Sequence, residues 1–301
     1  MGIFGALAGG ARRRRLTWPQ NNVASAPDAL VLTGAISRRS SSTGRSSSGL
    51  REFFRGDTIE ELKAYLDLAS LSDNDLRLLL DEMEKGETVI SRSDAGEPLR
   101  IVSVAKPIIF DASAGEILVE MFHTKIPMTE ECRLKATGMS EKFNPLRENS
   151  RVACGRALRE EVDMSSANEK MFAKRCLRLV ERQHSDKFVG LRCEYHLYLH
   201  MLKPEYLAAV RGHVPGSEQL TKVDERESAN PKSIWWTWVA PGPSDEDIHA
   251  HILRLAQCAG LSVTLDELAK ARKFGNAAAA IRKQLQLVNS YLDALMLTPR
   301  K

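Results

Sequence analysis

The first regular pattern in the chain is helical and begins near residue 58. Thr58 and Glu61 have the spacing of a capping box, in which two side chains satisfy free backbone N–H groups reciprocally. Ser72 or Asp73 can begin a second helix, because apolar residues then recur every three or four positions. We therefore expect a helical hairpin within residues 57–94, and we favour its packing on the following domain over a role in holding a partner.

Two apolar runs rich in Val and Ile follow the hairpin. They cover residues 99–110 and 116–126, and residues 111–115 between them have the composition of a turn. Adjacent runs joined by a short turn predict an antiparallel β-hairpin.

Two later segments are also predicted as strands. Residues 190–202 form the most strand-like run of the chain, and residues 233–239 form another, with Trp236 and Trp238 on one face and Trp235 on the other. An aromatic face can stack on a nucleobase, but tryptophan in a late strand is more often part of the core, and we favour the core.

The segment before the first of these strands is ambiguous. Residues 174–182 fit a strand, and a helix from Ala167 fits nearly as well. Within residues 190–202, His196 and His200 share one face, but a metal site needs a third ligand and the sequence offers no candidate for it.

The C-terminal sequence predicts two further helices beyond a break between Pro241 and Pro243. Ser244 can cap the first helix, which should end near Gly260, and a capping box at residues 264–267 precedes a long amphipathic stretch. A terminal helix of this length docks on its own domain or on a partner helix, and the pattern does not choose between them.

Residues 148–163 carry the candidate chemistry of the chain. Asn149 or Ser150 can cap a helix whose turns combine apolar and charged positions. Glu160 and Glu161 project from its C-terminal end, where a hard cation such as Mg²⁺ could take the carboxylates as oxygen ligands. Adjacent glutamates on a helix are more often a solvated face, so the spacing of the neighbouring residues decides.

This spacing resembles the Nudix box, the signature of the Nudix hydrolases. Glu148 is followed without a gap by Arg156, Leu158, Glu160 and Glu161 at the positions that the box requires. The chain is therefore similar to a divergent Nudix hydrolase-like domain.

Three positions depart from the box. Lys142 and Asp163 stand where the box has glycine, and Ala157 stands where it has the first glutamate of the helix. The lead-in from Met139 to Glu148 is similar to a variant found in divergent Nudix-like proteins.

The resemblance implies a fold and a domain organisation. The fold class would be α+β, with a Nudix-like α/β/α sandwich over residues 95–240. The helical hairpin would precede it, and a C-terminal helical extension of residues 241–301 would follow it.

The resemblance also implies the role of each box residue. Glu160 and Glu161 would be the catalytic residues and the ligands of Mg²⁺ or Mn²⁺. Glu148 and Arg156 would form a structural ion pair that ties the loop to the helix. Lys142, in place of a glycine, could contact a phosphate directly.

A site with two protein ligands holds Mg²⁺ weakly, because this ion keeps most of its waters. Another acid would strengthen such a site. The candidates are Glu194, Asp224, Glu225 and Glu227, none of which lies on a recognisable motif.

Two functions follow from the resemblance. The first is a weak or divergent Nudix-type hydrolase, a pyrophosphohydrolase of a nucleoside-diphosphate-linked small molecule, in which a metal neutralises the charge that develops on the phosphates. The alternative, which Ala157 favours, is a catalytically inactive Nudix-fold binding or assembly protein in an organelle, with a protein partner on its terminal helices. A helical-plus-sheet domain unrelated to Nudix proteins is a third interpretation.

Composition bears on location more than on chemistry. Residues 1–56 are rich in Arg and Ser and contain only two acids, Asp28 and Glu52, as in a disordered transit peptide for a mitochondrion or plastid. A disordered tail of a cytoplasmic protein is the alternative. The formal charge of +4 comes largely from this leader, so we predict no specific nucleic-acid partner.

Two further classes are disfavoured by the sequence. No apolar run approaches the roughly 20 residues of a membrane-spanning helix, so we expect no membrane partner. The five cysteines are widely spaced and odd in number, which favours reduced thiols over disulfides or a zinc site.

Overall fold

The computed structural model describes residues 52–93, 95–125, 133–185, 187–225, 232–240, 245–259 and 274–296. All of them belong to one compact unit that spans Val31–Lys301. Most of the predicted leader, the cap at Ser244 and the capping box of residues 264–267 lie outside the described residues.

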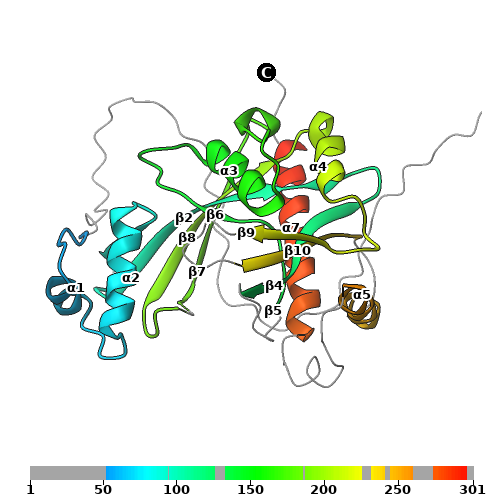
Figure 1. The fold of residues 1–301 in the computed structure, drawn as a ribbon. Coiled ribbons are helices and arrows are strands. Elements are labelled where there is room, and N and C mark those ends of the chain that lie inside the picture. Colours follow the sequence, from blue (N-terminus) through cyan, green and yellow to red (C-terminus); the bar gives the residue numbers. More distant parts are fainter. Residues whose placement is uncertain are drawn as a thin grey trace, which may run out of the picture. The chain divides into compact units, whose positions relative to one another are not determined.

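The fold is α+β, and its strands form two five-stranded sheets (Figure 1). In the first sheet the order is β1-β2-β8-β7, with β6 beside β2, and β2 and β8 are parallel while the other pairs are antiparallel. Its strands are β1 (Thr88–Arg92), β2 (Pro98–Ile108), β6 (Glu141–Lys142), β7 (Leu177–His184) and β8 (Arg192–Met201).

The second sheet is antiparallel throughout, in the order β3-β4-β10-β9 with β5 beside β4. Its strands are β3 (Phe110–Asp111), β4 (Glu116–Lys125), β5 (Arg133–Thr137), β9 (Thr221–Glu225) and β10 (Lys232–Val239).

The predicted hairpin of residues 99–126 is present only next to its turn, and the pairing of its two long strands is wrong. β2 and β4 lie in different sheets, and only the two-residue β3 pairs with β4, placing Phe110 opposite Ile117. The reason is that both edges of β2 are occupied, one by β1 and β6 and the other by β8, so no edge remains for β4. The chain crosses to the second sheet after Ile108 instead of turning back.

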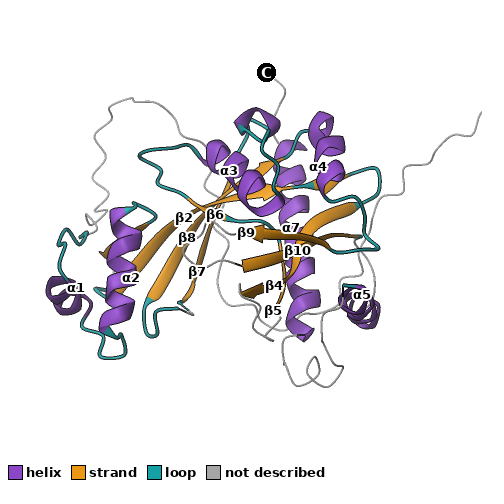
Figure 2. Cartoon of the chain, viewed as in Figure 1, coloured by secondary structure: helices purple, strands orange, loops and turns teal. Residues whose placement is uncertain are grey.

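The helices flank the two sheets (Figure 2). Two short 3₁₀ helices, Glu169–Met171 and Pro204–Tyr206, follow α3 and β8. The α-helices are α1 (Ile59–Leu66), α2 (Asp73–Glu84), α3 (Ser150–Val162), α4 (Leu207–His213), α5 (Asp245–Cys258) and α7 (Phe274–Met296). None of the helices within the described ranges combines the length and apolarity needed to cross a bilayer.

The predicted helical hairpin is present and begins at its expected caps. Thr58 caps α1 in a capping box with Glu61, and Ser72 caps α2 in a second box with Asp75. β1 follows α2 directly and joins the hairpin to the first sheet, a strand that the sequence pattern does not predict. The hairpin therefore packs on its own domain.

The strand β10 is buried on both of its faces. Trp236 and Trp238 face a cluster that contains α3, whereas Trp235 faces a cluster that contains α7, as the alternation predicts. All three tryptophans are at most 5% exposed, so they belong to the core and offer no face for a nucleobase.

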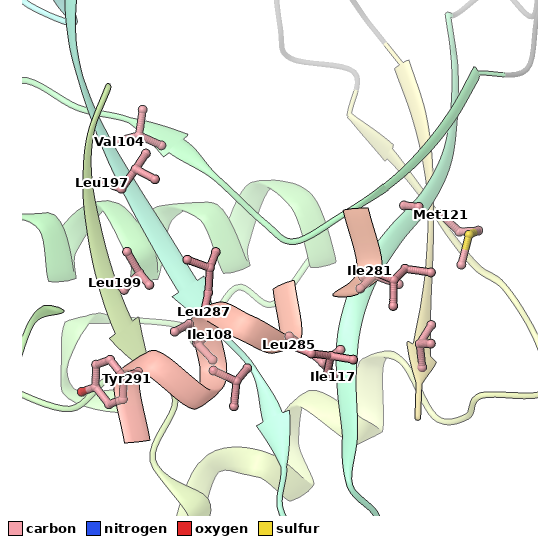
Figure 3. Packing of buried hydrophobic residues seen from close by; sticks show 14 of the residues in the cluster. Val104, Ile108, Ile117, Met121, Leu197, Leu199, Ile281, Leu285, Leu287 and Tyr291 are labelled. Carbon is pink, nitrogen blue, oxygen red and sulfur yellow. The ribbon is translucent and has the colours of Figure 1, made fainter. Parts of the chain in front are cut away.

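The long helix α7 packs on its own chain, which resolves the choice left open by the sequence. Its side chains share one apolar cluster with strands of both sheets (Figure 3). The labelled members from the first sheet are Val104, Ile108, Leu197 and Leu199; those from the second are Ile117 and Met121; those from α7 are Ile281, Leu285, Leu287 and Tyr291.

A buried carboxylate, Glu82 of α2, anchors the hairpin to the first sheet. It accepts a hydrogen bond from Arg100 of β2, from Lys142 of β6 at 2.8 Å and from Lys187 at 3.0 Å, and a fourth from Thr88 at 3.1 Å. Burying a carboxylate is costly unless it is paired, and here several donors offset the loss of water.

The Glu82 anchor predicts acid sensitivity. Burial alone raises the pKa of the Glu82 carboxyl, but hydrogen bonds and charge from Lys142 and Arg100 outweigh it and lower the pKa to about 2. A carboxyl with a lowered pKa in the native state adds stability that is present above its unfolded pKa and is lost as the pH falls through the native pKa. We expect the free energy of unfolding to fall by about 2 kcal/mol between pH 5 and pH 2 from this group.

Urea unfolding over this pH range measures that loss. The control is Glu82→Gln, which should be less stable than the wild type at pH 6 and should approach it at pH 2. A constant difference between the two proteins over the whole range would contradict the assignment.

The glycine inside α3 permits a close approach of two backbones. A Cβ added at Gly155 would lie 2.9 Å from the Cα and carbonyl carbon of Asn168, which precedes a 3₁₀ helix. We expect Gly155→Ala to lower the free energy of unfolding by about 1–3 kcal/mol, because backbone atoms must shift. Urea unfolding measures the change.

The matched control is Gly212→Ala in α4, where an added Cβ would meet no atom within 4 Å. This variant should be neutral or more stable by up to about 1 kcal/mol. Equal destabilisation of both variants would contradict the packing argument.

Candidate functional site

Helix α3 carries most of the predicted site residues, and it forms where the sequence predicts it. Asn149 is the N-cap, and its side chain accepts hydrogen bonds from the backbone N–H groups of Arg151 and Val152. Ser150, the other candidate cap, instead hydrogen-bonds His200 Nε2 of β8 at 2.8 Å. These contacts fix the start of α3 against the first sheet.

Arg156 joins α3 to the loop that precedes it. Its Nη2 donates to Glu148 Oε1 at 2.6 Å and to the carbonyl of Lys142 at 3.1 Å, and its Nη1 donates to Glu141. The ion pair between Glu148 and Arg156 that the resemblance implies is therefore present. Glu141 was missed, although it lies next to Lys142 in the lead-in, because nothing in its spacing distinguishes it from a surface acid.

Glu141 has an unusual electrostatic environment. Burial raises the pKa of its carboxyl to about 7, against the charge of Arg156, and the nearby Glu160 adds to the rise. Arg156 is thus shared between Glu148 and a buried carboxyl whose pKa is raised.

The two helix glutamates have different surroundings. Glu160 is exposed and lines an open depression with a cavity volume of about 290 Å³, together with Asp163 and residues of β9. Glu161 is 9% exposed and does not line this depression. The two glutamates that the resemblance makes joint metal ligands therefore differ in exposure, and only Glu160 lines this depression. The β9 residues in the lining are Lys222, Val223 and Asp224.

The position of the missing glutamate is closed. Ala157 is 0% exposed and packs in the cluster that contains Trp236 and Trp238. Residues 157 and 161 are four apart and share a face of α3, so two of the three box positions on the helix are covered, and only Glu160 is exposed.

The end of α3 explains the departure at Asp163. This residue is the C-cap and adopts the left-handed conformation, with φ 55° and ψ 35°. Glycine is the usual residue there, and Asp is one of the few others that tolerate it. A left-handed C-cap at residue 163 is thus compatible with the glycine that the resemblance would place there.

The other predicted residues are dispersed. The ammonium of Lys142 binds Glu82, away from the depression, so a contact with phosphate stays a prediction. Glu194 of β8 is 3% exposed and pairs with Arg182 and His196. Of the candidate acids only Asp224 lines the depression with Glu160; the side chain of Glu225 and the whole of Glu227 lie outside what the structure describes.

These residues do not fit a divalent metal site. Among the residues that the structure describes, no three or more His, Cys, Asp or Glu side chains are grouped so that they could hold a metal ion. Glu160 and Asp224 line one depression, but Asp224 is also bound by Lys222 at 3.2 Å and by Ser233 at 2.6 Å. We therefore derive no chemical step through a metal, and Mg²⁺ or Mn²⁺ stays a prediction.

No protein-family model matches this chain, and a search of characterised proteins finds no relative.

The closed face of α3 predicts the effect of restoring the box residue. Ala157→Glu would place a carboxylate where no surface is exposed, and burying an unpaired charge is among the costliest changes in a core. We expect the free energy of unfolding to fall by about 3 kcal/mol or more. Urea unfolding measures it.

The matched control is Ala64→Glu, at an exposed position inside α1. It should change the free energy of unfolding by less than about 0.5 kcal/mol. Ala157→Glu with the stability of the wild type would show that the space beside residue 157 opens to water.

Proposed function

We propose that this chain is a divergent Nudix-like protein that acts as a binding or assembly component and does not hydrolyse nucleotides. The carrying observation is the covered face of α3, where Ala157 is closed and Glu161 is 9% exposed. Metal-assisted phosphate chemistry needs several oxygen ligands that converge on an accessible ion, whereas of these helix positions only Glu160 is exposed.

The Nudix-like α/β/α sandwich is part of the proposal. Its support is the pair formed by Glu148 and Arg156 and the placement of α3 and α7 in separate clusters on opposite faces of β10. A chain that kept this ion pair while closing the catalytic face would retain the shape of the domain without its chemistry.

The predicted hydrolase is the second candidate, and one observation favours it. Glu160 and Asp224 line the same depression, so a cation that binds them could act on a phosphate there. Under this candidate, Mg²⁺ or Mn²⁺ and a nucleotide-type substrate would be required, and Glu160 would be essential.

Release of phosphate products separates the two candidates. Wild type, Glu160→Gln and the control Glu84→Gln, an exposed acid on α2, are incubated with Mg²⁺ or Mn²⁺ and a panel of nucleoside-diphosphate-linked compounds. We expect no turnover above the background by any of the three proteins, because the catalytic face is covered. Turnover that falls at least tenfold in Glu160→Gln and not in Glu84→Gln would overturn the proposal in favour of the hydrolase.

A further inference from the structure

One row of side chains on β7 is basic and faces away from α7. Leu177 and Leu179 point into the cluster that contains α7, so the alternate residues point to the opposite side of the sheet. Those residues include Arg178, Arg182 and His184, and all three are exposed. No acid occupies this row of β7.

The neighbouring strand β8 holds the two arginines in place. Arg178 Nη2 lies 2.9 Å from His196 Nδ1, and His196 Nε2 lies 2.8 Å from one carboxylate oxygen of Glu194. The other oxygen of Glu194 accepts from Arg182 Nε at 2.9 Å. Because arginine can only donate, His196 Nδ1 must accept the hydrogen bond from Arg178. The Nε2–H group of His196 then donates a hydrogen bond to Glu194. The chain of contacts runs across both strands.

The positive groups of this strip lie at the surface, and its negative group lies beneath them. The Glu194 side chain is 4% exposed, whereas the Arg182 side chain is 70% exposed, so the negative charge lies beneath and the guanidinium faces solvent. Each arginine uses one donor group in the network and keeps others for a ligand. Anchored arginines lose less side-chain entropy when they bind, so the strip is organised before a partner arrives.

An aromatic ring completes the strip. Tyr198 of β8 stands opposite Arg178 in the β-ladder, and the guanidinium lies 5.3 Å from the centre of its ring. Tyr198 is half-buried: it packs against the apolar cluster around α3 and meets the ring of Phe143 edge-on. The ring therefore supports the guanidinium of Arg178 and fixes its position for a phosphate.

We infer that the strip formed by Arg178, Arg182, His196 and Tyr198 binds the phosphate backbone of single-stranded RNA. This inference rests on the proposed function and names its partner class. Arg178 and Arg182 are four residues apart on one strand, about 13 Å, a span that two nucleotide steps of a flexible strand can bridge. The planar guanidinium fits phosphate oxygens in pairs, which favours a nucleic acid over a surface that merely carries charge. Contacts to phosphate carry no sequence information. Binding of this kind is therefore compatible with the prediction that the chain recognises no specific nucleic-acid sequence.

A simpler function for the same row is protection of an edge. β7 is the last strand of its sheet, and charged residues on such a strand prevent pairing with another chain. That function requires charge but neither the network through Glu194 and His196 nor the ring of Tyr198. It also predicts no affinity for RNA.

Fluorescence anisotropy with labelled oligouridylate tests the inference on the full chain. We expect binding that weakens linearly in the logarithm of salt concentration, with a slope of about −0.7 for each phosphate contact. The double variant Arg178→Ala and Arg182→Ala should bind at least tenfold more weakly, and its slope should be shallower by about 1.4, because two contacts are lost.

The control removes the same charge elsewhere. Arg77→Ala combined with Arg147→Ala changes two exposed arginines outside the strip and should leave the affinity within about twofold. Circular dichroism and the Tm of each variant report whether the fold is intact.

The inference would be overturned if the wild type showed no salt-dependent binding, or if both double variants lost the same amount of affinity for oligouridylate. It would also be overturned if polyglutamate bound more tightly than oligouridylate and its binding also required Arg178 and Arg182. That last result would assign the strip to an acidic protein segment. Phosphate release by the same preparations is a separate measurement, so a failure of the RNA inference and a failure of the proposed function are distinguishable.

Discussion

Apolar side chains on both faces of β2 and β10 impose the main constraint on this fold, because each face must be covered. Helix α3 covers one side, and α7 covers the other while packing against strands of both sheets. The cluster around α3 also contains residues of both sheets, so α3 and α7 join the two sheets from opposite sides, α7 as Figure 3 shows. A helix that looks like a C-terminal extension in the sequence is therefore internal to the domain. Its close approach to Gly138, where an added Cβ would lie 2.6 Å from the side chain of Gln284, reflects the same requirement.

The candidate site follows from how α3 is oriented within that core. Arg156 points to the preceding loop and binds Glu141 and Glu148, while the face that carries Ala157 and Glu161 turns inward. The ion pair organises the loop whether or not the inward face is catalytic. The contacts of Arg156 and the burial of Ala157 and Glu161 are therefore independent features of the same helix.

Local pattern accounts for what the sequence could predict. The sequence predicts the elements whose signals lie in neighbouring residues, namely helix caps and the alternation of apolar positions. These elements are the capped hairpin, α3, β8 and the two faces of β10. The pairing of β2 was not, since its partner β8 lies far along the chain. Glu82 and Glu141 were missed for the same reason: their cations come from other elements. The burial of Glu161 could have been inferred, because Ala153 and Ala157 precede it on the same helical face.

The left-handed turn at Asp163 has an electrostatic consequence for the depression beside it. A glycine would end α3 there without charge, whereas Asp163 adds an anion to a depression whose described lining also holds Glu160, Asp224 and the cation Lys222. Three carboxylates against one ammonium repel a polyphosphate that approaches the end of the helix. The residue that closes the helix therefore also makes this depression more favourable to neutral or cationic ligands than to anions.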